Sequence, residues 1–199
     1  MRAERLKVRV KLAGQPTEWA GAVVVRVAVF VDEQHVPLAA EFDEHDRAAV
    51  HAVAVLVGGA AEFKSLARAR AAALARAVAQ AGKHLPVNLA GARASPPETT
   101  APAPVVGTAR LIGGSGGTYR FGRLAVLAPW RGRAIGSRIL RLLEEVALAR
   151  GARRLLLHAQ TQVESFYAKH GYAVDTPRAE FLEDGIPHVR MSKALSLEL

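Results

Sequence analysis

The sequence predicts a single α/β domain, and three observations lead there: its length, its composition and the order of its segments. With 199 residues, the chain is long enough for one domain with a sizeable core and too short for two ordinary enzymatic domains. Half of the residues are apolar and 23% are charged, so the chain can fold without support from a metal or disulfides. Segments with the period-two pattern of strands alternate with segments of helical period.

The first quarter of the chain predicts two strands separated by a helix and a loop. Apolar and charged side chains alternate from Leu6 to Leu12, which indicates a half-buried strand. After a turn, Glu18 to Glu33 favours a helix despite its many valines. Residues His35 to Arg47 carry four acidic side chains and are interpreted as a loop. A second strand is expected from His51 to Val57.

A segment of unusual composition follows. Residues Leu66 to Ala81 are rich in alanine and predict a helix with little large apolar surface to bury. Residues Gly82 to Pro104 are rich in proline, which disfavours regular structure. We therefore expect a partly mobile insertion at about residues 58 to 104, within a single domain spanning residues 1 to 199.

The second half of the chain carries the clearest pattern. Two strands around a glycine turn predict a hairpin, and helices and strands then alternate to the end. The expected elements are strands Val105 to Ile112 and Tyr119 to Leu127, a helix from Ile135 to Gly151, a buried strand Arg154 to Ala159, a short helix Val163 to His170 and a last strand His188 to Lys193.

The segment Leu124 to Gly136 joins a strand end, a basic glycine-containing loop and a helix start. The first turn of a helix has unpaired N–H groups and partial positive charge, so a pyrophosphate can bond the backbone from Gly132 to Gly136. Small residues allow close approach, and Arg131 and Arg133 add charge. An isolated motif of this kind more often serves only turn geometry. Here, however, a second motif follows one βα unit later: Phe166-Tyr167-Ala-Lys-His-Gly171-Tyr172.

The two motifs together resemble the core of the GNAT acetyltransferases, and two further segments, Val29 to Pro37 and Glu183 to Met191, resemble the ElaA-like branch. The resemblance implies a mixed, mostly antiparallel sheet with helices on both faces, splayed where acetyl-coenzyme A enters. Ala134 stands where the family usually has its first loop glycine, and we expect it to admit the phosphate if its φ is negative. The residues implied for the cofactor are Leu124, Ala125, Val126, Arg131, Gly132, Arg133, Ala134, Ile135 and Gly136.

The resemblance also implies the chemistry, which is acetyl transfer to a primary amine by direct attack in a ternary complex. Tyr167 matches the family's general acid, and a phenol stays protonated at neutral pH. The base is open: Glu33 is the first candidate and His188 the second, with His35 and Glu44 also possible. A water chain could replace a single base. The acidic stretch Glu41 to Asp46 could attract cationic amines, although such loops are usually only solvated.

Several classes of function are disfavoured. The absence of cysteine excludes a thiolate nucleophile and sulfur-based zinc sites, and no histidine or carboxylate spacing suits a metal. His158, in an apolar run, is interpreted as a core histidine. The net charge of +9 suggests nucleic-acid binding, but no basic stripe is interleaved with aromatic residues, which disfavours this function. A GNAT-like protein that binds coenzyme A without catalysis is the main alternative. We expect a cytoplasmic location without a membrane span, and a homodimer is possible.

Overall fold

The computed structural model describes residues 7–57 and 104–196. The helix predicted at Leu66 to Ala81 and nearly all of the expected insertion lie outside the described residues. The elements are, in chain order, β1 (Lys7–Leu12), α1 (Pro16–Arg26), η1 (Val27–Glu33), α2 (Leu38–Glu41), η2 (Glu44–Arg47), β2 (Val50–Val57), β3 (Val105–Ile112), β4 (Thr118–Val126), η5 (Ala128–Trp130), α4 (Ile135–Ala149), β5 (Arg154–Gln160), η6 (Thr161–Val163), α5 (Glu164–Ala168), β6 (Ala173–Val174), β7 (Glu180–Glu183) and β8 (Ile186–Ala194).

The strands of the described ranges form one mixed, mostly antiparallel sheet, as expected. Their order is β1-β2-β3-β4-β5-β8-β6, with β7 also paired to β8. Only β4 and β5 run parallel, since α4 carries the chain back across the sheet between them. None of the described helices is long and apolar enough to cross a membrane.

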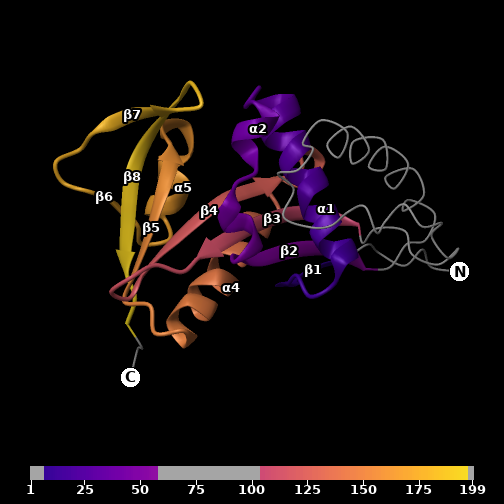
Figure 1. The fold of residues 1–199 in the computed structure, drawn as a ribbon, viewed down its shortest axis with the longest axis horizontal. Helices are drawn as coiled ribbons and strands as arrows, with labels where there is room; N and C mark the ends of the chain where they lie inside the picture. Colours follow the sequence, from indigo (N-terminus) through magenta and orange to yellow (C-terminus); the bar gives the residue numbers. More distant parts are fainter. Residues whose placement is uncertain (1–6, 58–103, 197–199) are drawn as a thin grey trace, which may run out of the picture.

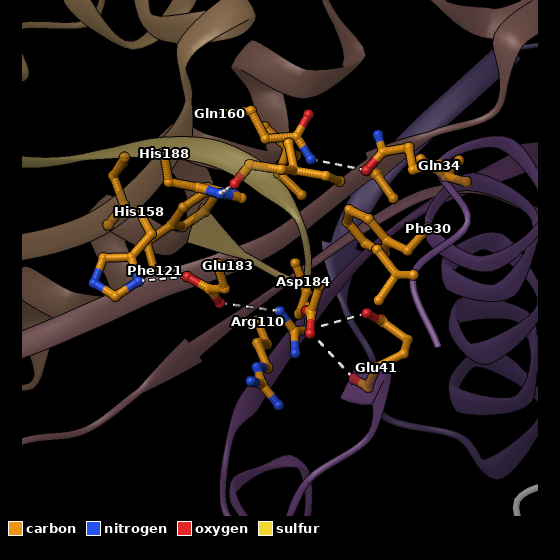
Figure 2. Close-up of a pocket in the computed structure, with 18 of the residues that line it drawn as sticks. Phe30, Gln34, Glu41, Arg110, Phe121, His158, Gln160, Glu183, Asp184 and His188 are labelled. Atoms are coloured by element: carbon orange, nitrogen blue, oxygen red, sulfur yellow. Dashed lines mark hydrogen bonds and ion pairs between the residues drawn. The ribbon is translucent and has the colours of Figure 1, made fainter. Parts of the chain in front are cut away.

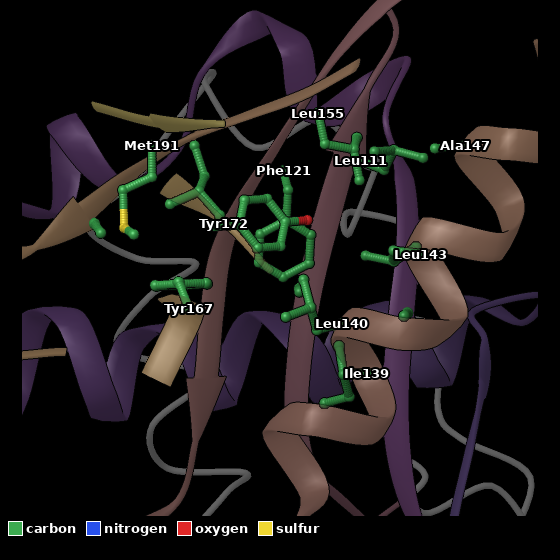
Figure 3. Close-up of a cluster of buried hydrophobic side chains, with 14 of the residues drawn as sticks. Leu111, Phe121, Ile139, Leu140, Leu143, Ala147, Leu155, Tyr167, Tyr172 and Met191 are labelled. Atoms are coloured by element: carbon green, nitrogen blue, oxygen red, sulfur yellow. The ribbon is translucent and has the colours of Figure 1, made fainter. Parts of the chain in front are cut away.

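Helices cover both faces of the sheet, which confirms the predicted layering (Figure 1). On one face α4 packs against β1 to β4 and buries Ile139, Leu140 and Leu143 completely. The aromatic rings of Phe121, Tyr167 and Tyr172 extend this core toward β5 and β8 (Figure 3). On the other face α1 packs against β2, β3 and β4 through a second cluster that contains Trp19 and Val23.

The first helix differs from its expected form. It begins at Pro16, where proline suits the first turn, and is α-helical only to Arg26. From Val27 to Glu33 the backbone continues as a π-helix. A π-helical segment rotates the side chains that follow it relative to an α-helix, and such segments often lie at functional sites. The segment His35 to Arg47, expected to be a loop, contains the short helices α2 and η2.

The sheet opens in its middle, between β4 and β5. These strands pair only from Thr118 to Arg120 and from Arg154 to Leu156, at one end of each strand. Beyond this point β4 continues along β3, and β5 continues along β8. A shift in the β3–β4 register lies opposite Arg123, whose φ of 54° is unusual for a residue other than glycine. This bulge bends β4 away from β5, so the described strands leave the β5-facing edge of Leu124 to Val126 without a partner.

Candidate active site

A cavity of about 550 Å³ lies where the sheet opens (Figure 2). Its floor includes Leu124, Ala125 and Val126, the strand segment that the sequence assigned to the cofactor. One wall comes from η1, α2 and η2, and the opposite wall from β5, α5 and the β7–β8 hairpin. Two parts of the chain far apart in sequence therefore face each other across one opening, which is the usual form of a small-molecule site.

The expected phosphate loop lies between the end of β4 and the first turn of α4. Since α4 has fifteen residues, its N-terminus offers unpaired N–H groups and a positive dipole end. Gly132 has a φ of 74°, and a side chain there would meet no described atom within 4 Å, so the backbone is open to a ligand. A side chain at Gly136, by contrast, would lie 3.5 Å from the ring of Phe166. The loop thus presents an open backbone turn beside the N-terminus of a long helix, and this combination fits a pyrophosphate.

Ala134 does not have the negative φ that was expected from the sequence. It is the N-cap residue of α4, with φ 55° and ψ 18° in the left-handed region. A residue with a Cβ loses about 1–2 kcal/mol in this conformation, which explains why glycine would be the easier residue here. The left-handed turn is thus retained at this position with alanine, at some cost in stability.

Arg131 and Glu33 form an ion pair at the edge of the cavity. The Arg131 guanidinium donates to the Glu33 carboxylate at 2.6 Å and to the backbone carbonyl of Val126 at 2.9 Å. Both side chains are substantially exposed, at 47% and 38%. Arg131 lines the cavity, whereas Glu33 lies at the end of the π-helix outside the lining residues. The carboxylate of the first candidate base is therefore held by an arginine of the phosphate loop.

Tyr167 lies on α5 and lines the cavity. The residue is 7% exposed, between the rings of Phe121, Phe166 and Tyr172. Burial raises the pKa of the Tyr167 phenol well above its usual range, because the phenolate would lose its hydration. No described side chain hydrogen-bonds its hydroxyl group. Tyr167 thus remains protonated at physiological pH and presents an uncommitted donor.

His188 lies on β8, opposite Gln160 of β5, and is 9% exposed. Its Nδ1 is 2.8 Å from the backbone carbonyl of Ile186. Because a carbonyl can only accept, Nδ1 carries the proton and the lone pair of the neutral ring lies on Nε2. His188 lines the same cavity as Tyr167. The structure therefore brings together the predicted acid and the second candidate base.

The two remaining candidate bases are separated. Glu44 on η2 is exposed and lines the cavity, whereas His35 follows η1 and does not. His35 instead has a φ of 60° in the turn between η1 and α2. Of the four candidates, His188 and Glu44 thus reach the cavity, and only His188 is buried there.

The acidic stretch Glu41 to Asp46 is mostly not solvated, contrary to the usual behaviour of such loops. The fully buried Arg26 of α1 binds the Glu41 and Asp46 carboxylates. Arg110 of β3 binds Asp43 at 2.6 Å and Asp46 at 2.8 Å. Burial acts to raise the pKa of Asp43, but the Arg110 hydrogen bonds and charge outweigh it and lower that pKa to about 2.

Arg123 links this buried network to the other wall of the cavity. Its guanidinium lies 3.2 Å from the Glu41 carboxylate and donates to the carbonyl of Ala40 at 3.0 Å. A second contact reaches Glu183 of β7 at 3.9 Å (Figure 2). The network explains the strained φ of Arg123, because these contacts fix the bulge that opens the sheet. This network was not predicted from the sequence, although Arg26 within the apolar run of α1 was a signal for a buried acidic partner.

His158 is not a core histidine. It projects from the exposed side of β5, and its Nδ1 lies 2.7 Å from Glu183. The hydrogen bond from His158 lowers the pKa of the Glu183 carboxyl. Strand alternation is the reason for the error: Leu157 and Ala159 face the core, so His158 between them faces the opposite side. Within the described residues no group of histidines and carboxylates could hold a metal ion.

This architecture defines an acyltransferase fold: a sheet splayed beside a helix N-terminus, with Tyr167 and His188 in the opening. Residues 98–195 match the family model of the GNAT acetyltransferase domain. YyaT, an uncharacterized protein of Bacillus subtilis, is 31% identical over 175 residues, which cover 88% of both chains. A structure from Lactobacillus plantarum, named only provisionally as an N-acetyltransferase, has 25% identity and a TM-score of 0.66, and the match covers 95% of this chain and 99% of that one.

The likeness extends to ElaA of Escherichia coli, with 17% identity and a TM-score of 0.60. That match covers 95% of this chain and 99% of ElaA, and it shows the shared fold. The chain belongs to the GNAT acetyltransferase superfamily, and its likeness to ElaA is consistent with the ElaA-like branch.

Proposed function

We propose that the protein transfers an acetyl group from acetyl-coenzyme A to a primary amine, by direct attack within a ternary complex. The observation that carries this proposal is that the free edge of β4, the phenol of Tyr167 and the imidazole of His188 line one and the same cavity. Family membership supports acetyl transfer in general, and the cavity supports the choice of residues.

Acetyl-coenzyme A fits the opening as a co-substrate. The pyrophosphate would bind the backbone from Gly132 to Gly136, with Arg131 and Arg133 at the rim. The pantetheine arm carries amide groups, and these can pair with the unpartnered edge of Leu124 to Val126 as an additional strand would. The acetyl group would then lie in the cavity beside Tyr167.

The chemistry needs a neutral amine and a protonated leaving group. His188 Nε2 takes a proton from the ammonium form of the acceptor, and the freed lone pair attacks the thioester carbonyl carbon. The C–N bond forms and a tetrahedral oxyanion results. As it collapses, the C–S bond breaks and the thiolate takes a proton from Tyr167. The nitrogen then loses its second proton, which restores the Tyr167 phenol, and His188 releases the first proton to solvent, so the products are the amide, coenzyme A and one proton.

His188 is preferred to Glu33 as the base because of where each lone pair lies. His188 Nε2 is free in the neutral ring, within the cavity, whereas the Glu33 carboxylate is paired with Arg131 outside it. A direct attack is also consistent with the absence of cysteine, which removes the commonest acyl carrier among side chains. The cytoplasmic location and a homodimer stay predictions.

The test is a panel of primary amines assayed for release of coenzyme A, with binding of acetyl-coenzyme A measured separately by calorimetry. We expect Tyr167→Phe and His188→Gln each to lower kcat by about 10²-fold or more while acetyl-coenzyme A affinity stays within twofold. Binding of acetyl-coenzyme A without turnover of any amine would instead indicate the alternative, a GNAT protein that binds coenzyme A without catalysis.

A further inference from the structure

We propose that the acceptor is an aliphatic amine that carries a second positive charge, as an α,ω-diamine does, and that Glu44 and Asp184 bind that second charge. This inference rests on the proposed function and names the substrate class for the same cavity. It follows from three parts of the cavity wall that differ in chemistry.

The inner part of the cavity can bind one polar group of a ligand. Tyr167 and His188 are each more than nine-tenths buried, and within the described residues the Tyr167 hydroxyl and His188 Nε2 have no hydrogen-bond partner. Both side chains are buried but these two atoms are open to the cavity, so a ligand there can hydrogen-bond to both. The reacting nitrogen of the acceptor supplies that partner.

The outer part of the cavity carries two carboxylates without an arginine. Glu44 projects from η2 on one wall, and Asp184 from the β7–β8 turn on the other. Both are exposed, and neither makes an ion pair with a described residue. The other lining carboxylates differ, because Glu41, Asp43 and Glu183 each lie close to Arg110 or Arg123. Glu44 and Asp184 are therefore the unpaired carboxylates of the wall, and Arg120, which is also exposed there and in no ion pair with a described residue, is the unpaired arginine.

The turn that presents Asp184 is fixed by the backbone. Asp184 and Gly185 have φ values of 53° and 79°, and they join β7 to β8 as a two-residue hairpin loop. Positive φ at both central positions is the requirement of a type I′ turn, which Asp-Gly meets well. Asparagine would suit this turn as well as aspartate does. The turn therefore does not explain why residue 184 is charged.

Apolar side chains also line the cavity, in addition to Tyr167, His188 and the two free carboxylates. Phe30 and Val36 line the cavity from the η1 side, and Ile186 lines it from β8. Such surface suits methylene groups, which gain from contact with apolar side chains. The cavity wall thus offers the three kinds of partner that a diamine needs: a free base for one amine, apolar side chains for the methylenes and free carboxylates for the second ammonium. The two free carboxylates also outnumber Arg120, the unpaired arginine of the lining, in a protein whose net charge of +9 would otherwise repel cations.

The experiment compares n-alkyl monoamines with α,ω-diamines of equal chain length, at a fixed acetyl-coenzyme A concentration, using coenzyme A release as the readout. We expect kcat/KM for the best diamine to exceed that of its monoamine by about tenfold at low salt, since exposed charge pairs are individually weak. The preference should shrink severalfold as ionic strength rises, because solvent-exposed charges are screened.

Variants then test which residues cause the preference for diamines over monoamines. Glu44→Gln and Asp184→Asn should each lower the diamine-to-monoamine ratio about threefold, and the double variant should bring it close to one. Glu145→Gln is the matched control, since Glu145 is an exposed glutamate of α4 outside the cavity lining, and it should leave the ratio unchanged.

Three outcomes separate this inference from the proposed function. Equal kcat/KM for monoamines and diamines, or a ratio unaffected by the double variant, would overturn the inference while amine acetylation stands. A large loss of kcat with both kinds of amine in Glu44→Gln would also overturn it, because that result would make Glu44 the base. Failure to acetylate any amine, with acetyl-coenzyme A still bound, would remove the proposed function and this inference together.

Discussion

The ion pair between Glu33 and Arg131 leads to the sharpest prediction about cofactor binding. As the structure stands, Arg131 is held by the Glu33 carboxylate at 2.6 Å and by the Val126 carbonyl at 2.9 Å. Val126 belongs to the strand edge proposed for the pantetheine arm, and Arg131 to the loop proposed for the pyrophosphate. Binding of acetyl-coenzyme A therefore competes with both contacts. We predict that Glu33→Gln tightens the binding of acetyl-coenzyme A.

The magnitude follows from the exposure of the pair. With side chains 47% and 38% exposed, the ion pair stabilises the protein by about 0.5–1 kcal/mol. Releasing Arg131 from it should lower the Kd by about two- to fivefold, since 1.4 kcal/mol corresponds to a factor of ten. Isothermal titration calorimetry at low and high salt measures this, and the gain should diminish at high salt. Arg131→Gln is the matched variant and should weaken binding, because it removes the arginine itself.

Two results would refute this reasoning. Weaker binding by Glu33→Gln would mean that Glu33 orients Arg131 for the phosphate rather than competing with it. Unchanged binding with a loss of kcat of about 10²-fold or more would show that Glu33 is the general base, as the sequence first suggested. Either result would be clear, because the Kd and kcat are measured separately.

The remaining predictions concern stability. Arg26→Met should lower the free energy of unfolding by about 3 kcal/mol in urea titrations, because Glu41 and Asp46 lose the fully buried arginine that binds both and keep only Arg123 and Arg110. Arg178→Met, at an exposed ion pair, should stay close to wild type, and a comparable loss there would contradict the argument. The pKa of Asp43 is about 2, below its ordinary 3.8. The ionised carboxylate should therefore contribute about 1 kcal/mol to the free energy of unfolding above pH 4, and this contribution should vanish as the pH falls toward 2. Asp43→Asn should lack this acid-dependent loss, and an identical pH profile for both proteins would count against the Arg110 pairing. Ala134→Gly should raise stability by about 0.5 kcal/mol, because relief of the left-handed φ outweighs the entropy of the unfolded glycine chain; a lower Tm in calorimetry would refute this.

Much of the fold could be predicted because its signals are local. Strand Val105–Ile112 agrees with its expected bounds, and the start of α4 at Ile135 was given by apolar residues at helical spacing. The short strands β6 and β7 were missed, since two or four residues cannot show a period. The π-helix after Arg26 was missed as well, because the hydrogen-bond register of a helix depends on the packing around it rather than on its composition.

The sequence by itself determined the family and predicted the side chains proposed for the site. Two motifs, the loop from Arg131 to Gly136 and the segment from Phe166 to Tyr172, were sufficient because each combines a local backbone shape with a specific side chain. The tertiary structure decided which side chains share a cavity. It joined His188 with Tyr167, paired Glu33 with Arg131, and buried most of the acidic stretch against Arg26 and Arg110. Long-range pairing of this kind depends on strand order and on the bulge at Arg123, and no local pattern along the chain encodes those distances.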